Sequence, residues 1–165
     1  MNDDSSVSVI TGDHRKMVDT IVDECCIDRS LIDAVYETRY GYAANIQTIL
    51  IPHLKIPHNQ IRHKLSLAHE IMHILHSDVI YRKAIDSSLK LKDQHFVHKH
   101  NHFIEKRADI LAALMNPDYA YQGYLEHTEF ARKGHISAPS HPPHNKRAEY
   151  LKSLHTEMLC EKTTT

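Results

Sequence analysis

One short segment limits what this chain can fold into: H-E-I-M-H at residues 69–73, inside the apolar run 65–75. Apolar residues of that run cover most of the circumference of an α-helix, so the spacing predicts a buried helix from about residue 59 to 75. A buried histidine or glutamate without a partner is costly, so a buried helix that carries three such side chains needs partners for them. The segment therefore predicts a polar site inside the core.

The spacing of these three polar residues points to zinc chemistry. His69 and His73 are four residues apart, so their imidazoles project from one face of a helix and can bind one tetrahedral zinc ion. Glu70 lies between them and can reach a metal-bound water as general base. The pattern therefore predicts a hydrolase with one zinc ion per chain.

A zinc hydrolase needs a third protein ligand and an open fourth position for water. The segment E-K-R-A-D at 105–109 offers a candidate on a helix expected from 101 to 115. Glu105 and Asp109 are four residues apart and share a helix face. We expect Glu105 to bind the metal and Asp109 to accept the outer N–H of a ligand histidine. The alternative is a pair of acidic side chains on the surface of an amphipathic helix.

Length and charge bound the class of protein. A chain of 165 residues predicts one domain, here 13–165, after a polar and acidic N-terminus, 1–12, that is expected to be flexible. The net charge of -1 predicts no broad attraction to nucleic acid or membranes. We expect no membrane span and no secretory signal, and hence a cytoplasmic protein, with export by a route that leaves no N-terminal signal still open.

Two residue types add expectations of their own. The three cysteines, Cys25, Cys26 and Cys160, form no disulfide framework and predict buried, reduced thiols. Histidine is abundant, at 16 residues. The densest patch predicts either a solvated polar loop or a metal-scavenging surface, and it comprises His95, His98, His100 and His102.

Hydrophobic periodicity predicts a mainly helical α+β domain with one small β-sheet packed on the helix that carries residues 69–73. A strand is expected over 45–51, ending at Pro52, with loops at 53–59 and 135–143. Residues 77–100 are expected to form a polar surface excursion with a weak helical pattern. Helices are expected at 13–26, 30–36, 59–75, 101–115, 117–134 and 148–158.

Three motifs in this order resemble a known family. The segments L-A-H-E-I-M-H at 67–73 and E-K-R-A-D at 105–109 look like those of the gluzincin metallopeptidases. The segment S-H-P-P-H-N-K-R at 140–147 is similar to the H-P-P-x-x-x-R segment of the HtpX and CAAX prenyl protease family. The resemblance covers about residues 43–154 and implies a zincin-like endopeptidase. It also implies that the strand at 45–51, preceded by residues 43–44, corresponds to that family's edge strand before the metal helix.

The resemblance further implies roles for two residues of the third motif. His141 is the first candidate for a donor to the oxyanion, and Arg147 is expected to orient His141 or to contact the substrate. The structural alternative is a Pro-Pro turn before a helix, with a surface arginine. Further donor candidates are Tyr119, Tyr121 and Tyr124.

Alternative functions stay open at this point. The chain also resembles the ImmA/IrrE peptidases, which cleave repressors in bacteria, although H-P-P-x-x-x-R favours the first family. A non-catalytic, histidine-rich metal-binding protein would explain the histidine content but gives Glu70 no role. An inactive interaction module is disfavoured, because it would have no reason to keep Glu70 in a buried helix. The expected partner is a protein or peptide substrate, with no nucleic acid.

Overall fold

The computed structural model describes residues 13–24, 26–38, 41–52, 60–88 and 94–162. The N-terminus at 1–12, expected to be flexible, and the predicted loop at 53–59 lie outside these residues. Helices dominate, with one small sheet, which confirms the predicted α+β class. The elements are α1 (Asp13–Glu24), a 3-10 turn (Arg29–Leu31), β1 (Ala34–Thr38), β2 (Ala43–Asn45), β3 (Thr48–Pro52), α2 (Gln60–Leu75), α3 (Asp78–Ser88), α4 (Gln94–Leu114), α5 (Pro117–Arg132) and α6 (His144–Lys162).

The sheet has the order β1-β3-β2, with β3 parallel to β1 and antiparallel to β2. The predicted helix at 30–36 is therefore wrong, because a single 3-10 turn leads there into strand β1. Val35 on β1 pairs with Ile49 on β3, and both side chains are fully buried, so cross-strand packing outweighs the weak helical pattern. The predicted strand at 45–51 is largely β3, but β3 lies in the centre of the sheet. The edge strand beside it is β2.

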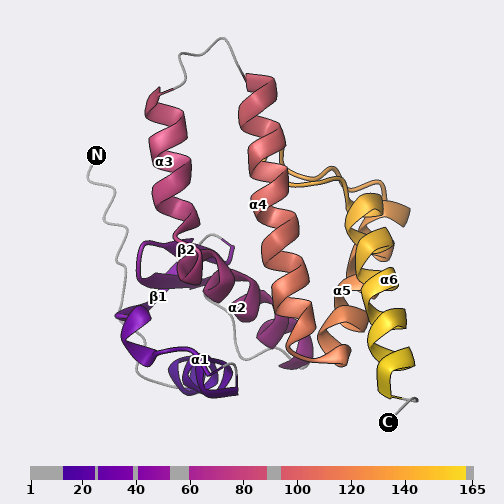
Figure 1. The fold of residues 1–165 in the computed structure, drawn as a ribbon, viewed down its shortest axis with the longest axis horizontal. Coiled ribbons are helices and arrows are strands. Elements are labelled where there is room, and N and C mark those ends of the chain that lie inside the picture. The colour runs from indigo at the N-terminus through magenta and orange to yellow at the C-terminus, as the bar shows by residue number, and fades with distance from the viewer. Residues whose placement is uncertain (1–12, 25, 39–40, 53–59, 89–93, 163–165) are drawn as a thin grey trace.

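Helix α2 lies at the centre of the core. It packs against the sheet, α1, α4 and α5 (Figure 1), so the helix with the H-E-x-x-H segment is buried as predicted. Leu67 and Ile71 bring its apolar face against the sheet and α1. Other buried members of this cluster come from α1, β3 and α4, and include Val18, Ile21, Ile49, Ile51, Ala108 and Ala112.

The expected excursion at 77–100 projects from the rest of the molecule, but the described part of it is regular helix rather than a weak helical pattern. Helices α3 and α4 extend together beyond the rest of the molecule (Figure 1), and α4 begins at Gln94 rather than near 101. Phe103 on α4 is 61% exposed, and the buried face of this helix carries Ile104 and Ala108. The sequence pattern misled because the outer half of α4 is helical without having a core to pack on, so it lacks apolar periodicity.

Helices α5 and α6 complete the core on the far side of α4. The side chain of Asn116 accepts a hydrogen bond from the backbone N–H of Asp118 at 2.9 Å and caps α5, and Pro117 occupies the first turn as predicted. Helix α5 ends at Arg132, and Gly134, two residues later, has a φ of +70°, which suits glycine just after a helix C-terminus. Gly123 lies where α5 approaches α6, since a Cβ there would be 2.9 Å from Cδ1 of Leu151.

The expectations about membrane spans and about the cysteine thiols have different outcomes. No helix within the described ranges is long and apolar enough to cross a membrane. The prediction of buried thiols is wrong for Cys26 and Cys160, which are exposed, and Cys25 lies outside the described residues. Cys26 lies in the turn after α1, and Cys160 lies near the end of α6, where neither has core to pack against.

Candidate metal centre

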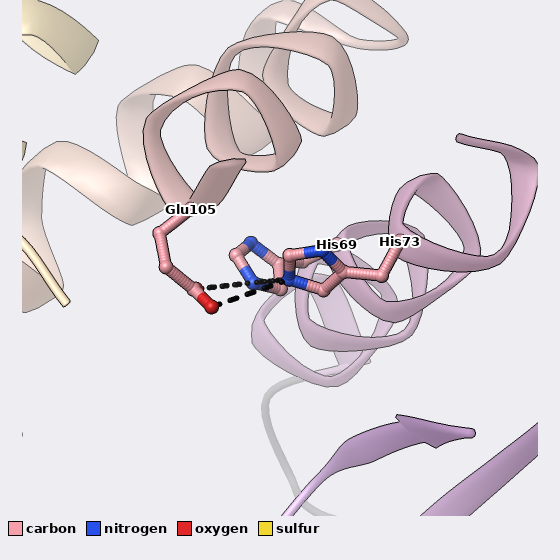
Figure 2. Close-up of side chains that lie close together, drawn as sticks. All are labelled: His69, His73 and Glu105. Carbon is pink, nitrogen blue, oxygen red and sulfur yellow. Dashed lines mark hydrogen bonds and ion pairs between the residues drawn. The ribbon is translucent and has the colours of Figure 1, made fainter. Parts of the chain in front are cut away.

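His69 and His73 on α2 and Glu105 on α4 direct their side chains to one point (Figure 2). The two Nε2 atoms are 3.0 Å apart. Glu105 Oε2 lies 3.2 Å from His69 Nε2, and its Oε1 lies 3.6 Å from His73 Nε2. Ligand atoms at about 2.0–2.2 Å from a tetrahedral zinc are roughly 3.3–3.6 Å from each other. The donor types and their spacing therefore fit one zinc ion.

Helix geometry explains why these side chains meet. Residues 69 and 73 stack on one face of α2, with ring centroids 4.6 Å apart and rings nearly perpendicular. Helix α4 packs on that face, and the small buried side chains of Ala108 and Ala112 allow a close approach. Glu105, one turn before Ala108, is thereby carried to the histidines and is itself 1% exposed.

His69 is held from behind by a buried carboxylate. Its Nδ1 lies 2.9 Å from Asp109 Oδ1, which assigns the Nδ1 proton to this bond and leaves Nε2 directed at the metal position. Arg147 on α6 donates two hydrogen bonds to Asp109, at 2.8 and 2.6 Å, and the hydroxyl of Tyr150 donates a third. Arg147 therefore binds Asp109, whereas the resemblance implied that it would orient His141 or contact the substrate.

His73 has an equivalent partner that the sequence analysis missed. Its Nδ1 lies 2.9 Å from Oδ2 of Asp78, a buried residue at the start of α3, and Arg107 on α4 donates to the other carboxylate oxygen. Both ligand histidines thus have a carboxylate behind them, and each carboxylate is paired with an arginine. The sequence held one signal for this role: Asp78 follows His73 by five residues. It is the first residue of α3, which the sequence analysis placed in a surface excursion.

Glu105 has two further partners, which come from outside α2. His141 Nε2 lies 3.1 Å from its Oε2, and Arg82 on α3 donates to its Oε1. Ser140 Oγ lies 2.9 Å from the other ring nitrogen of His141. The segment 140–147 therefore lies next to the candidate metal centre. Its His141 contacts the predicted metal ligand Glu105, and its Arg147 binds Asp109, the carboxylate that is hydrogen-bonded to His69.

These contacts set the protonation states of the centre. Burial by itself would lower the pKa of His69, but hydrogen bonds to Asp109 and Glu105 outweigh it and raise that pKa to about 10. Burial would raise the pKa of Glu105, but the three imidazoles around it hold its pKa far below the usual range. The pKa of Asp109 is also low, since Arg147 and His69 outweigh burial. Carboxylates that stay ionised at neutral pH are already in the form that a metal ion requires, whereas His69 would have to give up its second proton when a metal ion binds.

Glu70 differs from the other acidic groups of the centre. It is 9% exposed and lines two adjoining cavities of about 250 and 160 Å³. Within the described part of the chain no arginine or lysine forms an ion pair with it, whereas Asp78, Glu105 and Asp109 each have an arginine. His141 lines both cavities as well. Glu70 is thus placed to meet a ligand in these cavities rather than to neutralise a neighbour.

The tyrosines proposed as further donors lie elsewhere. Tyr119 is buried in the core, and Tyr121 is exposed. Tyr124 packs with α6, and none of the three lines either cavity beside the centre. The tyrosine that lines both cavities is Tyr42, just before β2, whose hydroxyl is hydrogen-bonded to Nδ1 of the buried His63.

The histidine-rich segment is helical and its members diverge. His95 and His98 are exposed on α4, and His100 stacks on Phe96. His102 Nε2 lies 3.0 Å from the backbone oxygen of Pro139. Among the described residues only His69, His73 and Glu105 form a group of three that could hold one metal ion.

Comparisons with known proteins add no family assignment. No protein-family model matches the chain, and no significant similarity to a curated protein or to a solved structure was found. Functional inference therefore depends on the residues themselves.

The structure joins six of the seven predicted site residues through direct contacts, namely His69, His73, Glu105, Asp109, His141 and Arg147. The seventh, Glu70, faces the adjoining cavities.

Proposed function

We propose that this protein is a zinc-dependent endopeptidase with the gluzincin ligand set His69, His73 and Glu105. One observation carries the proposal: the two Nε2 atoms lie 3.0 Å apart, each lies within 3.6 Å of one of the two Glu105 carboxylate oxygens, and both histidines are oriented by buried aspartates. Such orientation is typical of metal-binding histidines, since it fixes the tautomer and the ring direction. A polar cluster kept only for stability would not need the two Nε2 atoms and the Glu105 carboxylate to converge on one point.

The acid–base chemistry belongs to two side chains. When bound, zinc would lower the pKa of a water molecule and polarise the scissile carbonyl. Glu70 would accept the proton of the attacking water and pass it to the leaving amine. His141, beside Glu105 and facing the same cavities, would donate a hydrogen bond to the oxygen that becomes negatively charged.

An extended peptide fits the surroundings of the centre. Strand β2 is one of the two edge strands of the sheet within the described residues, and its Ala43 and Ala44 line the cavity of about 160 Å³ together with Glu70. An edge strand can pair with an extended segment through backbone hydrogen bonds, which places the segment's carbonyls in a defined position. This arrangement supports a peptide substrate over a small-molecule ester or amide.

The decisive experiment compares the wild-type protein with Glu70→Gln. We expect the variant to keep one zinc ion per chain by elemental analysis and to lose peptide cleavage by at least about 10²-fold, because a neutral amide cannot take up the proton. Substrates are found by comparing newly formed protein termini in cells that express either form. Retained cleavage in Glu70→Gln would overturn the proposed general base.

Glu129→Gln is the matched control, because Glu129 is an exposed carboxylate on α5 paired with Lys133. It should cleave at the wild-type rate.

The metal content separates the proposal from its main alternative. A histidine-rich metal-storage protein would bind several metal ions per chain and would cleave no peptide. The same comparison of termini, made on fractionated cells, would test the cytoplasmic location that the sequence predicts.

A further inference from the structure

A cavity of about 530 Å³ adjoins the metal centre on the side of α6. It lies between α4, the segment 133–143 that joins α5 to α6, and the first turn of α6. Figure 1 shows this segment passing close to α4 on its way to α6. Five of the lining residues are histidines: His98, His102, His135, His141 and His144.

The lining of this cavity is rich in hydrogen-bond donors and has no charged acid. Apart from the histidines it contains Ser137, Asn145 and apolar residues, and none of its lining residues is an aspartate or a glutamate. Ser137 Oγ is buried and has no hydrogen-bond partner among the described residues. A carboxylate only accepts hydrogen bonds, whereas imidazole N–H groups and a hydroxyl donate them, and an imidazole can also gain a proton beside an anion.

His141 connects this cavity to the reacting groups. It lines the 530 Å³ cavity and both cavities that contain Glu70, and its Nε2 lies 3.1 Å from Glu105. An extended peptide advances about 3.3 Å per residue, so a side chain within a few residues of the reacting carbonyl would reach the histidines beyond His141. The cavity is therefore placed as an extension of the peptide-binding cleft.

We propose that this cavity is a subsite for an acidic side chain, aspartate or glutamate, close to the cleaved bond of the substrate. The inference rests on the proposed peptidase function and names its substrate class. His98 on α4 and His135 on the opposite wall hold the carboxylate, together with Nδ1 of His102, since Nε2 of His102 already lies 3.0 Å from the backbone oxygen of Pro139. A second metal ion is disfavoured, since no three of these groups, within the described residues, come close enough to share one ion.

The test measures binding with the zinc-loaded Glu70→Gln protein, so that peptides are not consumed. Two fluorescein-labelled nonapeptides of alanine and leucine are compared by anisotropy, one with three central glutamates and one with three central glutamines. We expect the glutamate peptide to bind at least about tenfold more tightly, because charge-assisted hydrogen bonds form only with the carboxylates. Replacing both His98 and His102 by glutamine should reduce this ratio to below about twofold.

His95→Gln is the matched control, because His95 is exposed on the same helix and does not line the cavity. It should keep the full ratio of affinities. Equal affinities for the two peptides, or a ratio that survives the double substitution, would overturn the subsite. A second zinc ion per chain that is lost in the double variant, with equal peptide affinities, would assign the cavity to a metal instead. Preferential binding by Glu70→Gln without cleavage by the wild type would contradict the peptidase and leave the acidic-peptide site standing.

Discussion

Oδ2 of Asp78 lies 2.9 Å from Nδ1 of His73, so the first residue of α3 orients a histidine of the preceding helix. Arg107 on α4 holds the other oxygen of the same carboxylate. Three helices thus meet at one buried aspartate, and the position of His73 depends on how α3 and α4 pack against α2. This relationship makes α3 a part of the metal centre, although none of its residues belongs to the proposed ligand set.

Asp78→Asn is expected to weaken zinc binding by about tenfold to a hundredfold, because an amide no longer favours the required tautomer and leaves Arg107 without its counter-charge. The dissociation constant can be measured by competition with a chromophoric chelator. Asp118→Asn, which changes an exposed aspartate at the start of α5, should bind zinc like the wild type. An unchanged dissociation constant in Asp78→Asn would assign Asp78 to packing alone.

Arg147→Met is expected to lower the free energy of unfolding by about 3–5 kcal/mol, because it leaves the buried carboxylate of Asp109 without its cation. The measurement is urea unfolding of the zinc-free protein. Adding Asp109→Asn to this variant removes the unpaired charge and should recover part of the loss. Arg132→Met, an exposed arginine on α5, should change the free energy of unfolding by less than about 0.5 kcal/mol. Strict additivity of the two substitutions would contradict a direct coupling.

The sequence allowed the ligand set to be predicted because helical spacing is local: residues 69 and 73, and 105 and 109, share a face whatever the rest of the fold does. It did not allow Asp78, Arg82 or Arg107 to be assigned, since their roles depend on how α3 packs against two other helices. Strand β1 was missed for a related reason, because its pairing partner β3 lies 14 residues further along the chain, at Thr48 for Ala34. Non-local pairing decides such segments more than their own pattern does.

Gly123→Val is expected to lower the free energy of unfolding by about 1–3 kcal/mol, because the added carbons would overlap two leucine side chains. A Cβ at Gly123 would already lie 2.9 Å from Cδ1 of Leu151 and 3.3 Å from Cδ2 of Leu65. Ala131→Val places the same side chain at an exposed position of the same helix and should have a small effect. Equal free energies of unfolding for the two variants would mean that α5 and α6 can move apart at Gly123 without loss of stability.

His127 should make stability fall in acid. Burial, together with the positive charge of Arg147, lowers the pKa of His127 from 6.5 to about 3, and its Nδ1 lies 3.0 Å from Nδ1 of His144. The unfolded chain therefore binds this proton between about pH 6.5 and pH 3 while the folded protein does not, so the contribution is complete above pH 6.5 and declines as the pH falls.

The measurement is the free energy of unfolding of the wild type and of His127→Gln, each at pH 7 and pH 5. The wild type should lose about 2 kcal/mol more than the variant over this interval. The difference between the two proteins isolates His127, because the titrations of the metal centre are common to both. His95→Gln, exposed on α4, serves as the control and should follow the wild type. An identical loss in wild type and His127→Gln would mean that His127 is already solvated or protonated in the folded protein.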